Sequence, residues 1–328
     1  MNLARVDEIA KAVLYEGYML YPYRPSSVKN RQRWNFGVVY PQAYREAQDG
    51  EEPCSMQTEC LVSGNRATIL EVKVRFLHLQ TRTMRSSADV RTRPLPDGWQ
   101  EAVEREVSPA DLTLEGLLLE PLRHAFAFPS QTQTNSERDG IVERRHEVVD
   151  GAITVSAERL GENLFKVSIH VKNVSPIKNS SADRDAALMQ CFVSTHTILG
   201  VKGGEFVSLL EPPPELQDVA SCCQNVGAWP VLVGEHGQRD TLLASPIILY
   251  DYPQIAPESP GDLFDGTEID EILSLRIMTL TDEEKREIRE SDDRARQILD
   301  RTEAMPVEQF MKLHGAMRGL RPLKEDIS

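Results

Sequence analysis

The chain has 328 residues and a formal net charge of −14, with 40% hydrophobic and 27% charged residues. This composition allows a buried core and excludes disorder of the whole chain. The negative charge repels nucleic acid and anionic lipid at long range, so a nucleic-acid-binding role would need a strong local basic patch.

The sequence predicts a cytoplasmic protein. The N-terminal stretch has acidic residues among its apolar ones and no long apolar core, which argues against a secretory signal. No run of about 18 apolar residues occurs, so no membrane span is predicted. The five cysteines, an odd and sparse number, fit reduced thiols.

The first third of the chain is predicted to be β-rich behind a short helix. Apolar residues at helical spacing predict that helix over residues 3–13. Residues 14–44, rich in Tyr, Trp, Phe and Val, predict two strands. Residues 55–83 predict two more strands joined by a turn at 63–65. Apolar residues four apart predict a helix over 98–107.

The middle of the chain predicts an antiparallel meander. Residues 129–140 are polar and predict a loop or hinge between domains. Alternating apolar runs between residues 143 and 174 predict three strands with turns at 150–151 and 161–163, because Asp-Gly between alternating runs is typical of a hairpin.

Further strands are predicted beyond the meander. The apolar run over 187–199 predicts a strand, and Gly200–Gly204 predicts the turn that ends it. Two more strands are expected around 229–233 and 242–249. At the C-terminal end, a capping box at Thr281 predicts a helix to about residue 301, and a second helix starts at Pro306.

These patterns predict an α+β, mainly β fold with antiparallel, sandwich-like sheets and a helical C-terminal segment. The predicted division is 1–128 and 141–267 as two β-rich regions, followed by 268–328 as the helical segment. The alternative, one sheet continuous across the loop at 129–140, stays open.

The clearest functional signal is a segment that lacks acidic residues. Residues 17–45 contain no Asp or Glu but several Arg, Lys, Tyr and Trp residues. Because Arg, Tyr and Trp are enriched in the residues that dominate protein interfaces, this segment predicts a docking surface for a protein partner. The docking residues are Tyr21, Tyr23, Arg24, Lys29, Arg31, Arg33 and Trp34.

Two other interpretations of this segment remain. Its aromatic residues can simply form strands whose Arg side chains pair with acids elsewhere. Stacking aromatics beside phosphate-binding Arg residues are also typical of single-stranded nucleic-acid sites. The net charge of the chain ranks this interpretation last.

The opposite end of the chain is acidic. Residues 251–304 hold sixteen Asp or Glu residues against seven Lys or Arg. The stretch 261–271 does not match an EF-hand, because non-ligand residues stand where the motif needs acids. A looser cation site at Asp262, Asp265 and Glu268 is one interpretation; capped turns or pairing with the basic segment is the other.

No catalytic motif stands out in the sequence. There is no nucleophile elbow, phosphate loop or dinucleotide fingerprint, and the adjacent Cys222 and Cys223 do not have zinc-site spacing. We expect the five thiols to be buried or inert. The sequence therefore assigns no catalytic residue and predicts no cofactor. It leaves enzymatic activity open but favours a non-enzymatic role.

Several blocks resemble one known family. The run from Val13 to Arg31, followed by Arg33-Trp34-Asn35-Phe36-Gly37, resembles the opening of a bacterial protein family associated with gene clusters of nickel-iron uptake hydrogenases. Residues 55–62 and 268–284 are similar to later blocks of that family, so the resemblance covers nearly the whole chain. No activity or catalytic residue comes with it. It implies a role in the assembly, maturation or scaffolding of a metal-containing oxidoreductase.

The sequence thus predicts a non-catalytic accessory, assembly or scaffolding protein for a multi-subunit oxidoreductase. The resemblance implies nickel-iron hydrogenase subunits or maturation factors as its partners. The alternative is a small-molecule or metal-binding enzyme with a site built on the acidic segment.

Overall fold

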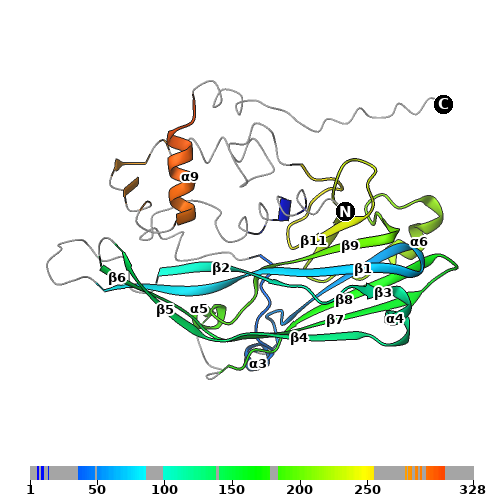
Figure 1. Cartoon of the computed structure of the whole chain (residues 1–328), viewed down its shortest axis with the longest axis horizontal. Coiled ribbons are helices and arrows are strands. Elements are labelled where there is room, and N and C mark those ends of the chain that lie inside the picture. The colour runs from blue at the N-terminus through cyan, green and yellow to red at the C-terminus, as the bar shows by residue number, and fades with distance from the viewer. Residues whose placement is uncertain are drawn as a thin grey trace.

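The computed structural model of the chain is shown in Figure 1. The residues it describes are 36–48, 50–85, 99–137, 140–177, 184–254 and 293–306, with the single positions 6, 9, 10, 14, 278, 280–282, 285, 286 and 289.

The strands β1 to β11 of the described residues form one antiparallel sheet. Its path runs β10-β11-β9-β1-β8-β7-β4, while β2, β3 and β6 also pair with β1, and β5 pairs with β6. The bounds are β1 (Ser55–Arg85), β2 (Trp99–Val107), β3 (Leu112–Thr113), β4 (Leu122–Phe128), β5 (Gln131–Glu137), β6 (Gly140–His146), β7 (Val149–Arg159), β8 (Leu164–Asn173), β9 (Val193–Val207), β10 (Trp229–Leu232) and β11 (Thr241–Ser245). The predicted mainly β, antiparallel α+β fold is confirmed.

Short helices connect and cover these strands. They are α3 (Gln42–Ala47), α4 (Leu114–Leu119), α5 (Arg184–Leu188), the 3₁₀ turn η1 (Pro214–Leu216), α6 (Gln217–Ser221) and α9 (Asp293–Glu303). Thr113 caps α4, because its side-chain oxygen accepts the backbone N–H of Gly116 at 3.1 Å.

The strand β1 organises the whole sheet. It is 31 residues long and pairs with β8 over its first part, with β9 over its middle, and with β2 and β6 over its end. In Figure 1 it runs along the length of the molecule, with β2 continuing beside it. Because its partners come from both predicted β-rich regions, one hydrogen-bonded sheet spans 55–245.

The sheet curls on itself around an aromatic core. Phe76 of β1 lies 6.1 Å from Phe126 and 6.0 Å from Phe128 between ring centroids, although both belong to β4, three strands away along the sheet. Phe192 completes the cluster, 4.6 Å from Phe76. The apolar inner faces of β1, β7, β8 and β9 therefore face one interior, as a sandwich-like sheet requires.

Two predicted turns are wrong, because paired glycines let two strands approach closely there. The predicted turn at 63–65 lies inside β1, and the predicted turn at Gly200–Gly204 lies inside β9. Gly64 pairs with Gly204, and a Cβ on Gly204 would lie 2.7 Å from the Ser63 carbonyl oxygen. The glycines mark an irregularity in the pairing of two long strands, not a reversal of the chain.

The predicted helix over 98–107 is also wrong, since these residues form β2. This strand pairs with the second half of β1. Its acids meet basic residues across the ladder: Glu104 lies 3.2 Å from Arg75, and Glu106 lies 3.2 Å from Lys73. Cross-strand pairing outweighs the helical propensity of a Glu-rich segment.

The predicted loop at 129–140 instead contains β5, the first strand of a hairpin. β5 pairs with β6, and β6 pairs with the end of β1. The predicted turn at 150–151 lies within β7, where Gly151 leaves room for the ring of Phe126 on the paired strand. The turn at 161–163 is confirmed between β7 and β8, and the strands predicted near 229 and 242 are confirmed as β10 and β11.

The N-terminal part is described only at a few positions. Val6, Ile9 and Ala10 are helical and buried against apolar side chains of β9, β10 and β11, in agreement with the predicted helix. Of the strands predicted within 14–44, the described part shows a single bridge, between Val39 and Phe192, and then α3.

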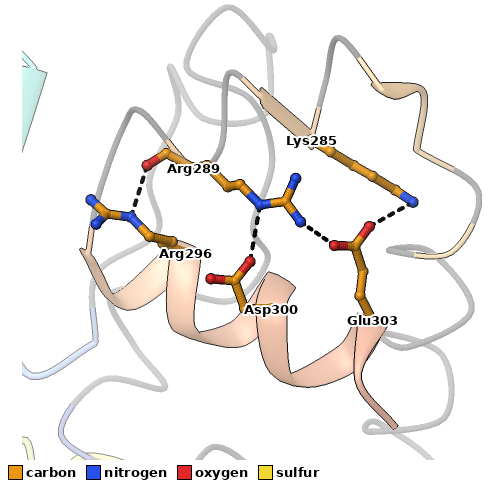
Figure 2. Close-up of polar contacts among 5 residues, drawn as sticks. All are labelled: Lys285, Arg289, Arg296, Asp300 and Glu303. Carbon is orange, nitrogen blue, oxygen red and sulfur yellow. Dashed lines mark hydrogen bonds and ion pairs between the residues drawn. The ribbon is translucent and has the colours of Figure 1, made fainter.

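Described residues near the C-terminal end form ion pairs across α9 (Figure 2). Nε of Arg289 donates to Asp300 at 2.9 Å, Arg289 also pairs with Glu303, and Nζ of Lys285 lies 2.9 Å from Glu303. Residues 11 to 18 positions apart would be about 16–27 Å apart along one straight helix. The predicted single helix from 281 to 301 is therefore wrong, although positions 282, 285, 286 and 289 and the residues of α9 are helical.

Candidate functional site

A pocket of about 460 Å³ opens between α3 and the sheet, at the point where β1 begins. Residues of α3, the loop that follows it, and strands β1, β7 and β8 line it. The lining residues are Gln42, Arg45, Glu46, Gly50, Cys54, Ser55, Ala152, Thr154, His170 and Lys172.

The floor of the pocket follows from strand alternation. Inward residues of β7 and β8 are buried in the core, so the residues between them point outward. In register, Ala152 lies opposite Lys172, and Thr154 lies opposite His170. On the next strand, Ser55 pairs with Lys172, which brings the three strands together below the pocket.

The wall of the pocket is held in place by α3. Tyr44 packs its ring against Tyr40 at 5.4 Å, and both tyrosines are buried. The pKa of Tyr40 is raised to about 12, mainly because its hydroxyl group is buried. With this face of α3 turned inward, Gln42, Arg45 and Glu46 face outward.

The pocket carries more positive than negative charge. Nε of Arg45 donates to the Gly50 carbonyl at 3.1 Å, and Nη1 donates to Sγ of Cys54 at 3.4 Å. Among the described residues, no carboxylate forms an ion pair with Arg45 or Lys172. The one acid in the lining, Glu46, accepts a hydrogen bond from Gln42 at 2.7 Å.

Arg123 extends this basic character along the sheet. It is exposed on β4 and lies opposite Thr154 in register, on the same face as the pocket floor. In a chain with a net charge of −14, the row Arg123, His170, Lys172 and Arg45 forms a basic surface, here called the basic face. Such a surface attracts anions and acidic segments of other proteins.

The docking residues predicted from the sequence lie outside the described residues. These are Tyr21, Tyr23, Arg24, Lys29, Arg31, Arg33 and Trp34. The same acid-free segment continues into the described part, where Phe36 is 46% exposed, Tyr40 and Tyr44 belong to the core, and Arg45 lines the pocket. Part of the aromatic signal is therefore explained by packing.

The predicted cation site at Asp262, Asp265 and Glu268 also lies outside the described residues. Within the described ranges, no group of three or more His, Cys, Asp or Glu side chains is arranged to hold a metal ion. No helix in those ranges is both long and apolar enough to cross a membrane.

The cysteines are all free thiols, and three of them, Cys54, Cys60 and Cys191, are buried. Burial raises the thiol pKa of Cys60 and of Cys191, and it raises that of Cys223 to about 11. The thiols of Cys60, Cys191 and Cys223 are therefore held in the protonated, weakly nucleophilic form at neutral pH.

The sequence interpretation missed the pocket because its residues come from positions far apart in the chain. Alternation in 164–173 does predict that His170 and Lys172 point outward, but only the pairing of β1 with β8 brings Ser55 beside them. No protein-family model matches the chain, and no curated protein sequence matches it.

Proposed function

We propose that this chain is a non-catalytic accessory protein that docks an acidic segment of a protein partner. One observation carries the proposal: the basic face, with its pocket, joins Arg45 at the end of the acid-free segment 17–45 to Arg123, His170 and Lys172, in a chain with a net charge of −14. The resemblance to a hydrogenase-associated family directs the search for the partner toward nickel-iron hydrogenase subunits and their maturation factors.

The charges of the basic face support docking over catalysis. Arg45, Arg123 and Lys172 have no carboxylate partner among the described residues. Cationic side chains of this kind steer an acidic partner toward the surface and fix its register. Arg24, Arg31, Arg33 and Trp34 stay docking residues predicted from the sequence.

Copurification from the native host at moderate salt tests the proposal. The expected result is stoichiometric recovery of hydrogenase subunits or maturation factors with the wild-type chain. Reversing two charges in the pocket, Arg45→Glu with Lys172→Glu, should reduce that recovery by about tenfold or more, because like charges then meet the acidic partner.

A matched control distinguishes the effect of charges in the pocket from the effect of the net charge of the chain. Arg66→Glu with Arg239→Glu changes the total charge by the same amount on exposed residues outside the pocket. If this pair reduces recovery as strongly as the pocket pair does, the pocket is not the docking site. A chain that purifies alone, with a stoichiometric metal ion, would replace docking by the enzyme alternative.

A further inference from the structure

A second charged cluster lies on the inner face of the curled sheet, around Arg105 of β2. The guanidinium carbon of Arg105 lies 4.8 Å from the ring centroid of Phe128. Its Nε donates to Nδ1 of His78 at 3.4 Å, and its Nη2 lies 3.2 Å from Nε2 of His146. The two imidazole rings meet edge to face at 4.8 Å.

Both histidines in this cluster are neutral. A guanidinium only donates hydrogen bonds, so each imidazole accepts one and has a free lone pair to do so. Burial lowers the pKa of His78 to about 3, and His146 and Arg105 lower it further in the same direction. Burial and Arg105 also lower the pKa of His146. The three side chains together thus carry one positive charge.

That charge is not balanced by an acid. No carboxylate in the described ranges forms an ion pair with Arg105, and burial lowers its pKa. Two acids in this part of the sheet have other ion-pair partners: Glu101 of β2 pairs with Arg82 and Arg144, and Glu147, which follows β6, pairs with Arg145. A partly buried cation with only neutral partners costs free energy that a bound anion would offset.

The guanidinium has one edge left for such an anion. The imidazoles occupy the edge formed by Nε and Nη2, and Phe128 covers one face of the plane. No described residue accepts a hydrogen bond from Nη1. The edge formed by Nη1 and the second hydrogen of Nη2 therefore keeps the paired donors that bind an oxyanion in a bidentate manner.

We propose that Arg105, with His78 and His146 behind it, binds a small dianionic oxyanion such as sulfate or the phosphate group of a small molecule. The histidines hold the guanidinium by its inner edge, so its outer edge is already oriented for the ligand. The site is separate from the basic face, because it lies on the interior side of the sheet.

The bound oxyanion couples to the protonation of the histidines. Two negative charges beside the cluster counteract the effect of Arg105, so binding raises the pKa of His146; protonation at Nε2 then ends its hydrogen bond from Nη2 of Arg105. By linkage, affinity for the oxyanion rises as the pH falls through that raised pKa. If binding raises the pKa of His146 by about one unit, the affinity for the oxyanion at low pH increases about tenfold.

A histidine-resolved nitrogen NMR titration of the full chain tests the proposal between pH 5 and about 8. Sodium sulfate is the probe, because its charge stays constant over this range, and sodium chloride at equal ionic strength is the reference. The expected result is a saturable shift of the His78 and His146 ring nitrogens and a raised pKa of His146 in sulfate.

Variants assign the effect to Arg105. Arg105→Gln should weaken sulfate binding by about tenfold or more, and Arg105→Lys, which keeps the charge but loses the paired donors, should weaken it as well. Arg45→Gln alters the docking pocket only and should leave the shifts unchanged, so failure here is distinct from failure of the docking proposal. Unchanged histidine signals in the wild-type chain, or equal shifts in Arg105→Gln, would overturn the site.

Discussion

Asn173 shows how much one buried polar side chain can hold together. Its Nδ2 donates to the carbonyls of Val39 and Gln190, both at 2.8 Å, and its Oδ1 accepts the backbone N–H of Ser175 at 2.9 Å. The side chain is fully buried with all its groups paired. It therefore ties the chain before α3 to the end of β8, below the docking pocket.

Replacing Asn173 by Leu should destabilise the fold by about 3 kcal/mol. The variant leaves the Gln190 carbonyl and the Ser175 amide without the Asn173 side chain, while the Val39 carbonyl keeps the bond from the Phe192 N–H. Each group left unpaired in the interior costs about 1–3 kcal/mol less any relaxation. Urea unfolding at neutral pH measures the loss. Asn135→Leu, on the exposed strand β5, is the control and should change stability by less than about 0.5 kcal/mol. Equal losses in both variants would contradict the assigned role of Asn173.

At the scale of elements, Gly151 sets how closely β4 and β7 pack. A Cβ at this position would lie 2.1 Å from Cζ of Phe126, the residue directly across the ladder. The ring therefore lies over the glycine, which pins the register of the two strands.

Gly151→Ala should destabilise the sheet by about 1–3 kcal/mol, because the Phe126 ring must move out of a packed core. Thermal and urea unfolding measure the change. Gly161→Ala is the matched control, since its new Cβ would meet Leu164 at an ordinary 3.6 Å. Combining Gly151→Ala with Phe126→Leu should cost less than the sum of the single changes, and strict additivity would show that the clash is absent.

The elements that the sequence predicts well are those whose signal is local. Alternation over 164–173 marks the inner and outer faces of β8, and the turn before it carries its own residues. The sequence did not predict the strand β2, because the partners of Glu104 and Glu106 lie about thirty residues earlier in the chain. The sequence did not predict the polar strand β5 either. Its side chains are exposed, and only its pairing with β6 makes it a strand.

The candidate site depends even more on distant contacts. The acid-free segment is visible in the sequence, but whether a given aromatic residue is core or surface depends on what covers it. Tyr40 and Tyr44 are buried by packing on each other and on the end of the sheet. Arg105 carried no signal at all, because only the pairing of β1 with β2 and β6 surrounds it with two histidines.

For the whole molecule, buried neutral histidines predict sensitivity to mild acid. Burial lowers the pKa of His196 from 6.5 to about 4, while that of His78 falls to about 3. The unfolded chain binds these protons near pH 6.5, so it holds more protons than the folded chain below that pH. Stability is therefore complete above pH 6.5 and falls as the pH drops toward 4 and then 3.

Between pH 7.5 and pH 5 each of these two histidines should cost about 2 kcal/mol of unfolding free energy. Urea unfolding at the two pH values measures the difference. The variant His196→Gln can still pair with Ser194 and Ser245 but cannot take up a proton, so its stability should depend less on pH. The same pH dependence in the variant and the wild type would contradict the assignment.

The length of β1 has a consequence for how the chain is made. The end of β1 can pair with β2 soon after synthesis, but the edges of β1 that pair with β8 and β9 stay unpaired for about eighty residues of further synthesis. Contacts of such high sequence separation close slowly. Folding speed in this molecule is therefore governed by its second half, and a chaperone that shields the waiting strand would raise the yield of folded chain.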